Sequence, residues 1–226
     1  MIEGRYDRNK PTLNQEDQEA LGRSTVAIFG VGGLGGWQAQ FLARIGVGKI
    51  ILIDGDDFQA SNLNRQVFST EENLGCSKVE EAKKALAKIN SETKVETHHL
   101  FLENLDLLPN LKGCDLIMDG ADNLALRKLA EDYAQALNIP WIHGAIAGWE
   151  GQFGIFTPES GALGKLYPAG EKTQFAKSGN LSFVVANTAS SQVNLAVQHL
   201  LGRETCPYNR LCRVDFQYMD IVSFEL

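Results

Sequence analysis

Apolar residues in the first 150 positions follow two alternating patterns. Short apolar runs rich in β-branched residues are typical of buried strands, and longer stretches with apolar positions three or four apart predict helices. The strands are expected at residues 24–29, 49–53, 94–100, 114–118 and 140–143. The helices are expected at residues 16–21, 34–45, 77–89 and 124–137. Such alternation favours the α/β class, with a doubly wound, mostly parallel sheet that carries helices on both faces.

The pattern changes after residue 150. Residues 151–156 alternate between apolar and small or polar positions with no helix before them, which indicates an added antiparallel strand. Residues 157–179 lack periodicity and predict a long loop, whereas the apolar stretch 181–201 predicts a buried helix that Gly202 ends. The tail, 211–226, alternates again and predicts one or two strands. The sheet is therefore expected to be extended by C-terminal antiparallel strands.

No repeat or composition shift divides the chain, so one domain of residues 1–226 is expected. We predict an N-terminal helical arm at 1–22, a core at 23–150 and an antiparallel extension at 151–226. The extension includes a crossover loop at about residues 159–180, and a loop of this length is where a lid or a partner-binding segment is expected.

Charge and cysteine content narrow the functional classes. The 226 residues include 21 Lys and Arg against 28 Asp and Glu, a net charge of −7, which argues against a general nucleic-acid or anionic-membrane surface. No basic and then apolar leader precedes the first motif, and the stretch 181–201 carries too many polar residues for a membrane span. With only four cysteines, these features predict a reduced, cytoplasmic protein with no nucleic-acid or membrane partner.

A glycine-rich segment, G-V-G-G-L-G at residues 30–35, follows the first predicted strand and opens a helix. Glycine lets a phosphate approach the backbone closely, and the helix N-terminus offers unpaired N–H groups. Asp54 ends the second predicted strand, where a carboxylate can accept a hydrogen bond from a ribose hydroxyl. A tightly packed turn or an ordinary NAD site would show the same pattern. The predicted nucleotide-binding glycines are Gly30, Gly32, Gly33 and Gly35.

Polar and cationic residues follow this fingerprint and suggest a ligand with more negative charge than a dinucleotide. Asp56 comes directly after the ribose-binding segment, and Asn62 and Gln66 offer neutral donors. Arg65 offers a planar fork for phosphate oxygens, and Lys78 places a point charge at the start of the next helix. A triphosphate needs such cations, although ordinary solvated Lys and Arg residues on the surface would look the same in the sequence.

A third element, D-G-A-D-N at residues 119–123, lies at the carboxyl end of the fourth predicted strand. Ligands of doubly wound sheets bind outside these strand ends, and a carboxylate there can hold Mg²⁺ together with phosphate oxygens. The motif has two acids three residues apart, Asp119 and Asp122, so one carboxylate can hold a metal while the other has a structural role. Either Asp122 or Asn123 could instead cap the following helix.

Taken together, the motifs resemble those of the ThiF/MoeB/HesA adenylyltransferases, bacterial relatives of the ubiquitin-activating enzymes. The resemblance covers nearly the whole chain, and its motifs occur in the family's order. They are R-Y-D-R at 5–8, G-V-G-G-L-G at 30–35, I-D-G-D-D at 53–57, S-N-L-N-R-Q at 61–66, G-C-S-K at 75–78, D-G-A-D-N at 119–123 and G-A-I-A-G-W-E-G-Q-F at 144–153.

The resemblance implies ATP-dependent adenylation of the C-terminal glycine carboxylate of a small ubiquitin-like protein, often a sulfur carrier, with release of pyrophosphate. It places Gly32 in the phosphate loop, Asp54 at the ribose and Asp122 at Mg²⁺. It also implies that Asn62, Arg65 and Lys78 contact phosphates. Arg8 looks like the arginine that dimers of the family lend to the partner's active site, so a homodimer is expected. The expected catalytic residues are thus Arg8, Arg65, Lys78 and Asp122.

The chain also departs from the family pattern. Many members hold Zn²⁺ with two C-x-x-C pairs, but no such pair occurs in this sequence, so no structural zinc is predicted. Residues 159–180 contain no cysteine that could form a thioester with an activated carrier. A packing role is favoured for Cys76 over a reactive thiolate, and a satisfied buried histidine is favoured over a substrate contact for His143. Trp149 and Phe153 could flank a groove for the carrier's tail.

The sequence is also compatible with other functions. A related enzyme could adenylate a small molecule, a peptide or a modified tRNA base instead of a protein carrier. From a different class, the chain could be an NAD-dependent oxidoreductase or a non-catalytic scaffold that has kept the fold.

Overall fold

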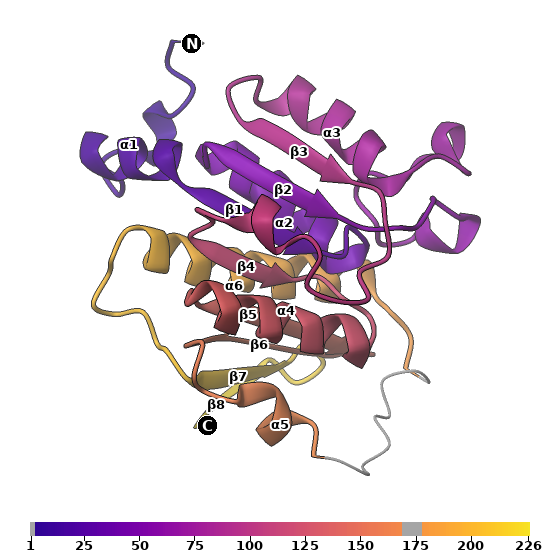
Figure 1. Ribbon diagram of the computed structural model, residues 1–226, viewed down its shortest axis with the longest axis vertical. Coiled ribbons are helices and arrows are strands. Elements are labelled where there is room, and N and C mark those ends of the chain that lie inside the picture. The colour runs from indigo at the N-terminus through magenta and orange to yellow at the C-terminus, as the bar shows by residue number, and fades with distance from the viewer. Residues whose placement is uncertain (1–2, 169–177) are drawn as a thin grey trace.

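The computed structural model describes residues 3–168 and 178–226, and its centre is a sheet of eight strands in the order β3-β2-β1-β4-β5-β6-β7-β8 (Figure 1). Neighbouring strands from β3 to β5 run parallel, and β6, β7 and β8 are antiparallel to their neighbours. The parallel strands are β1 (Thr25–Phe29), β2 (Lys49–Ile53), β3 (Lys94–His98), β4 (Leu116–Asp119) and β5 (Trp141–Ala147). The antiparallel strands are β6 (Glu150–Phe156), β7 (Arg210–Asp215) and β8 (Asp220–Glu225). The predicted mostly parallel sheet with an antiparallel extension is confirmed.

Helices cover both faces of this sheet, as the sequence predicted (Figure 1). One hydrophobic core lies between the sheet and helices α2 and α6, and α3 packs beside α2. The second core lies between the opposite face of the sheet and α4. The helices are α1 (Gln15–Arg23), α2 (Gly33–Ile45), α3 (Lys78–Ile89), α4 (Leu124–Leu137), α5 (Ala162–Leu166) and α6 (Ser182–Leu200). Short 3₁₀ helices are η1 (Asp7–Asn9), η2 (Ala60–Asn62), η3 (Glu71–Asn73) and η4 (Leu108–Leu111).

Local sequence explains where several of these elements begin and end. Asn14 caps α1 in a capping box with Asp17, because the side chain of each residue accepts the other's backbone N–H. Gly46 ends α2 in the left-handed conformation, with φ of 99°, which glycine adopts without steric cost. All four residues of β4 are buried, as expected for a central parallel strand with helices on both faces.

Contacts between distant segments changed two of the predicted elements. The fifth strand continues to Ala147 instead of ending at residue 143, because it pairs along its whole length with β6 and the hairpin turns at Gly148. The predicted loop at 157–179 contains the short helix α5, which buries Ala162 and Leu163. The middle of the predicted crossover loop, residues 169–177, lies outside the described residues.

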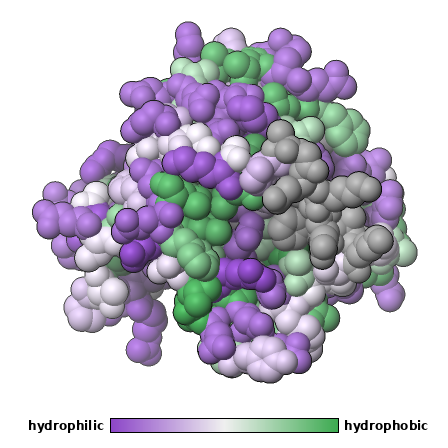
Figure 2. Space-filling model, turned by 90° about the horizontal axis from the view of Figure 1, so that it is seen from below, coloured by the Kyte–Doolittle hydropathy of each residue, from purple (hydrophilic) through white to green (hydrophobic). Residues whose placement is uncertain are grey.

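The last strand forms an exposed edge of the sheet. β8 pairs with β7, and its apolar residues Ile221, Val222 and Phe224 remain exposed. Figure 2 shows the face seen from below Figure 1, where apolar side chains form a strip between hydrophilic ones. Among the described helices, none is long and apolar enough to cross a membrane.

Candidate functional site at the carboxyl ends of the strands

A cleft of about 620 Å³ opens at the carboxyl ends of the central parallel strands. β1 lies between β2 and β4, so the connections that leave these strands diverge and leave a crevice there, which is where doubly wound sheets bind ligands. The cleft is lined by Gly30, Gly32, Gly33, Asp54, Asp56, Arg65, Gln66, Lys78, Asp122 and Arg127, with apolar walls from Leu100, Phe101 and Leu102. Most of the predicted site residues are therefore brought together.

The floor of the cleft is made of backbone. A Cβ atom on Gly35 would lie 1.8 Å from the carbonyl oxygen of Gly30, and a Cβ on Gly120 would lie 2.4 Å from the same oxygen. Gly30 itself has φ of 87°. These contacts hold the loop, the first turn of α2 and the end of β4 together, so Gly35 serves packing and does not line the cleft. α2 has no side-chain cap, which leaves its first N–H groups available to a phosphate.

Asp54 joins the glycine loop to the end of β2. Its Oδ2 accepts the N–H of Val31 at 2.6 Å, and its Oδ1 accepts the N–H of Asp56 at 2.8 Å. Burial raises the pKa of the Asp54 carboxyl, while the nearby Lys78 ammonium and these hydrogen bonds lower it. The carboxylate thus fixes the loop and also faces the cleft, where it is available to a ribose hydroxyl.

The predicted phosphate-binding cations both line the cleft. Lys78 is the first residue of α3, its side chain is only 7% exposed, and its Nζ lies 2.7 Å from Oδ2 of Asp56. Arg65 is half-buried and donates from Nη1 to the carbonyl of Ser61 and to Oδ1 of Asn64, both at 2.9 Å. Lys78 is paired with one exposed carboxylate, and the guanidinium of Arg65 contacts only neutral acceptors among the bonds given above. Both cations can therefore turn toward an added anion.

Amide side chains near these cations have different roles. The Oε1 atom of Gln66 is buried and has no hydrogen-bond partner within residues 3–168 and 178–226, although the residue lines the cleft. Asn62 is also buried but does not line the cleft, and its Oδ1 accepts the N–H of Gln59 at 2.9 Å. Gln66 is therefore placed to meet a ligand, and Asn62 shapes the η2 turn that precedes Arg65.

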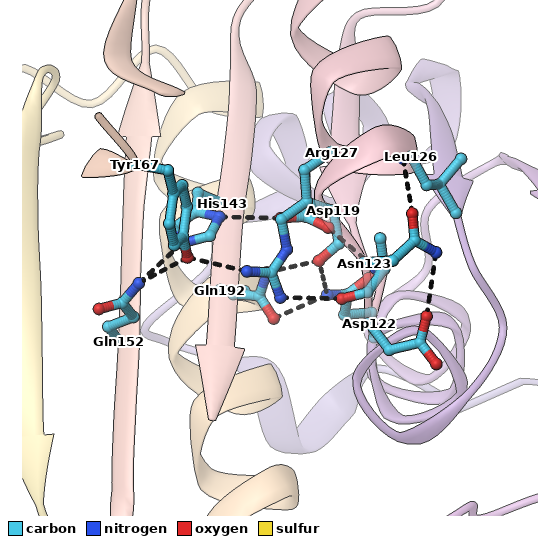
Figure 3. A network of polar contacts seen from close by, with 11 residues as sticks. Asp119, Asp122, Asn123, Leu126, Arg127, His143, Gln152, Tyr167 and Gln192 are labelled. Atoms are coloured by element: carbon cyan, nitrogen blue, oxygen red, sulfur yellow. Dashed lines mark hydrogen bonds and ion pairs between the residues drawn. The ribbon is translucent and has the colours of Figure 1, made fainter. Parts of the chain in front are cut away.

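Asn123, and not Asp122, caps α4. The Oδ1 of Asn123 accepts the N–H of Leu126 at 2.9 Å, so the cap that the sequence left open is assigned. Asp122 is exposed at the cleft, and its Oδ1 accepts one hydrogen bond, from Nδ2 of Asn123 at 3.2 Å (Figure 3). An exposed carboxylate beside a phosphate-binding loop fits Mg²⁺, which prefers oxygen ligands and retains several waters.

Arg8 does not line the cleft of its own chain. It is exposed on η1, and the neighbouring residues Arg5 and Tyr6 contact Ile89 and Asn90, just before the start of β3. The N-terminal arm lies at the amino ends of the parallel strands (Figure 1), whereas the cleft opens at their carboxyl ends. A catalytic role for Arg8 therefore requires a second subunit.

Sequence reasoning missed a buried polar network behind the cleft. Asp119 and His143 are fully buried, and Nδ1 of His143 lies 2.8 Å from Oδ2 of Asp119 (Figure 3). Arg127 and Tyr167 extend the network toward the cleft and toward α5. The spacing of Arg127 four residues after Asn123 could have placed it on the first turns of α4, but Tyr167 follows a stretch without periodicity and gave no signal. The interpretation of His143 as a buried histidine is confirmed.

Because of burial, this histidine is expected to make stability depend on pH. Desolvation, and then the charge of Arg127, lowers the pKa of His143 below 6.5, although the hydrogen bond to Asp119 opposes the shift. As pH falls below 6.5, the unfolded chain takes up a proton that the folded chain excludes, so the free energy of unfolding falls by at most about 1.4 kcal/mol per pH unit for this group. We therefore expect the free energy of unfolding, measured with urea between pH 7.5 and 5.5, to fall less steeply with decreasing pH in His143→Asn than in the wild type.

His199 provides the control for this prediction. Burial also lowers its pKa, but it is more exposed than His143 and lies away from the cleft, so His199→Asn should remove a smaller part of the slope. If the free energy of unfolding depended on pH equally in the wild type and in His143→Asn, His143 would not be the source of that dependence.

The cysteines are free and dispersed. Cys76 is exposed, Cys114 and Cys206 are buried, and burial raises the pKa of the Cys114 thiol to about 11. In the described ranges, no three His, Cys, Asp or Glu residues are grouped so that they could hold a metal ion. The absence of structural zinc stays a prediction from the sequence.

Comparison with known proteins gives consistent similarities. The model of the ThiF family matches residues 6–226. The chain is 38% identical over 154 residues to the adenylyltransferase and sulfurtransferase MOCS3-1 of Zea mays. This match covers 67% of this chain and 33% of that protein. It is 33% identical over 210 residues to the sulfur carrier protein adenylyltransferase of Thermus thermophilus, covering 88% of this chain and 78% of that protein. It thus spans about a third of the first of these curated relatives.

Solved structures resemble the fold as a whole. Escherichia coli MccB, crystallised with MccA-N7isoASN, has a TM-score of 0.84 at 25% identity and covers 100% of this chain and 72% of its own. The same protein crystallised with ATP has a TM-score of 0.81 at 25% identity, over 98% of this chain and 71% of its own.

Proposed function

Because the chain belongs to the ThiF family, we propose that it is an ATP-dependent adenylyltransferase. Its substrate in this proposal is the C-terminal glycine carboxylate of a small ubiquitin-like sulfur carrier, and its products are the acyl-adenylate and pyrophosphate. The observation that carries the proposal is the convergence of Lys78, Arg65 and Asp122 on a single cleft with the glycine loop. The names of the relatives from Zea mays and Thermus thermophilus support the reaction class.

The charges in the cleft suit this chemistry. A carboxylate that attacks an α-phosphate meets another anion, and negative charge grows on the phosphoryl and pyrophosphate oxygens. Lys78, released from Asp56, and Arg65 would neutralise these oxygens, and the N–H groups of the glycine loop would bind them without reorganisation. No covalent nucleophile is required, because the substrate brings its own ionised carboxylate.

The remaining residues of the cleft would position the nucleotide. Asp54 would accept a ribose hydroxyl, and Leu100 and Phe101 give apolar surface for a base. Mg²⁺, held through Asp122 and phosphate oxygens, would supply further countercharge when bound. Orientation and electrostatics, not proton transfer, would then account for most of the acceleration.

ATP–pyrophosphate exchange tests the proposal directly. The protein would be mixed with ATP, Mg²⁺ and each small protein ending in Gly-Gly from the source genome, and the acyl-adenylate would be sought by mass spectrometry. Small carboxylic acids, peptides and tRNA form parallel arms that cover the related adenylating enzymes. Adenylation of one of those substrates alone would change the substrate class, and no exchange with any substrate would favour a scaffold.

Nucleotide binding separates the proposal from an NAD-dependent oxidoreductase. Binding of ATP with Mg²⁺ is expected to weaken by about 10-fold or more in Arg65→Ala, because the variant lacks a charge-assisted phosphate contact. NAD is expected to bind more weakly than ATP to the wild type. Preferential NAD binding that survives Arg65→Ala would support the oxidoreductase instead.

We also propose that a homodimer completes each site with Arg8 of the other subunit. Its position at the far end of the sheet from its own cleft supports this arrangement. The Arg8→Ala and Arg65→Ala proteins should each be inactive alone. After random subunit exchange, about half of the dimers would be mixed, each with one complete site, so about a quarter of the wild-type exchange activity should return. No recovery despite exchange shown by native mass spectrometry would reject the lent arginine.

A further inference from the structure

The buried network joins four separate elements behind the cleft (Figure 3). Asp119 ends β4, Arg127 lies in α4, His143 lies in β5 and Tyr167 follows α5 directly. The hydroxyl of Tyr167 is close to Nη1 of Arg127 at 2.8 Å, to Nε2 of Gln152 at 3.0 Å and to Nε2 of His143 at 3.2 Å. One hydroxyl group therefore meets side chains from α4, β5 and β6.

The donors and acceptors in this network determine the direction of each hydrogen bond. A guanidinium and an amide NH₂ can only donate, so the Tyr167 oxygen accepts from Arg127 and from Gln152. The hydroxyl proton and the amide of Gln152, whose Nε2 lies 3.1 Å from Nε2 of His143, both point to that ring nitrogen as the acceptor, which leaves Nδ1 to donate to Asp119. Phenylalanine at position 167 has no atom that can replace this acceptor and donor.

Arg127 depends on that hydroxyl for its orientation. Its Nη2 donates to the carbonyl of Ala121 at 2.9 Å, and its Nη1 donates to Tyr167. Its Nε lies 3.5 Å from Oδ2 of Asp119 and makes no hydrogen bond within the described ranges. Tyr167 thus fixes one amino group of the guanidinium. The other amino group fixes the carbonyl of Ala121, the residue directly before Asp122.

We propose that Tyr167 is a positioning residue for the cation-binding carboxylate. By fixing Arg127, it holds the backbone of the turn at residues 119–123, so that Asp122 presents its carboxylate to the divalent cation of the bound nucleotide. This inference rests on the proposed function, because it takes Asp122 as the ligand of that cation. Tyr167 itself does not line the cleft, so it acts on Asp122 through Arg127 and the Ala121 carbonyl.

The test measures how much Mg²⁺ strengthens nucleotide binding, without any turnover. Calorimetry would give the Kd of α,β-methylene-ATP in EDTA and in Mg²⁺. In Tyr167→Phe the strengthening by Mg²⁺ should fall about 5- to 30-fold, since one partly buried hydrogen bond to a charged group is lost. Binding in EDTA should stay within about twofold of the wild type, because the glycine loop and Lys78 are unchanged.

Matched variants make the result specific. Tyr208→Phe also removes a tyrosine hydroxyl bonded to a histidine, His199 at 2.6 Å, but away from the cleft, and it should keep the wild-type response to Mg²⁺. Arg127→Lys cannot contact Ala121 and Tyr167 with the same fork, so it should lose the response as Tyr167→Phe does. The double variant should lose no more than the larger single effect, because both changes break the same chain of contacts.

The outcomes separate this inference from the function it rests on. If Asp122→Asn loses the response to Mg²⁺ and Tyr167→Phe keeps it, the positioning role is wrong and the proposed function stands. An equal loss in EDTA and in Mg²⁺, or an equal loss in Tyr208→Phe, would show general structural damage and overturn the positioning role. If the wild type fails to bind the nucleotide at all, the proposed function itself fails.

Discussion

Replacing Gly35 with alanine is expected to prevent the chain from folding stably. The added Cβ would lie 1.8 Å from the carbonyl oxygen and 2.9 Å from the carbonyl carbon of Gly30, and 3.2 Å from Cγ2 of Ile28. The two shortest of these contacts are to the backbone of Gly30, which cannot move aside as the end of a flexible side chain can. We expect a loss of about 3–5 kcal/mol or more, out of a total stability of about 5–15 kcal/mol for a domain of this kind. Urea unfolding and soluble yield would measure it.

Gly22→Ala is the matched control for this prediction. Gly22 lies on the exposed side of α1, and an added Cβ would meet no atom within 4 Å. Alanine in a helix should stabilise the protein by about 0.5–1 kcal/mol, because glycine loses more backbone entropy on folding. A Gly35→Ala protein that unfolds at the wild-type urea concentration would contradict the close contact that forms the floor of the cleft.

The second large effect is expected from Asp122→Asn. Asparagine keeps the size of the side chain but removes the negative charge, so the divalent cation loses its protein ligand. Under the proposed function, ATP–pyrophosphate exchange should fall by about 10²-fold or more, a loss typical of removing an electrostatic contact that stabilises the transition state. The free energy of unfolding should change by less than about 0.5 kcal/mol, because the side chain is exposed and Asn123 supplies the helix cap.

Asp220→Asn controls for the loss of one exposed carboxylate. Asp220 lies at the start of the edge strand β8, outside the cleft, and its substitution should leave exchange unchanged. If Asp122→Asn kept more than a third of the wild-type rate, the assignment of Asp122 to the metal would be wrong. If Asp220→Asn lost as much activity as Asp122→Asn, the effect would come from net charge and not from the site.

The parallel core could be predicted because its local signals agree with its tertiary environment. The run at residues 49–53 is both β-branched and buried, so β2 occupies the predicted residues. The helix predicted at residues 124–137 begins and ends as α4 does, because Asn123 caps it and Asn138 adopts a left-handed conformation after it. Strong caps leave little room for tertiary packing to move a boundary.

The parts that sequence reasoning missed depend on contacts between distant segments. A glycine motif cannot show that Gly35 and Gly120 both press on the same carbonyl, because that contact joins α2 to β4. Tyr167 and Arg127 are 40 residues apart, and the segment around Tyr167 has no periodicity that would place its side chain. Asp122 and Asn123 are equally good caps by residue type, and only backbone geometry distinguishes them.

The floor of main-chain atoms has an evolutionary consequence. Substitutions that alter side chains along the rim can accumulate, but no residue larger than glycine fits at positions 35 and 120 without displacing backbone. Proteins that descend from this chain could therefore evolve to bind new partner molecules while the glycine backbone at the floor of the cleft stays unchanged. Diversification within such a lineage should be concentrated in the segments after β5, where Asn180 and Val185 line the cleft with side chains that can be replaced.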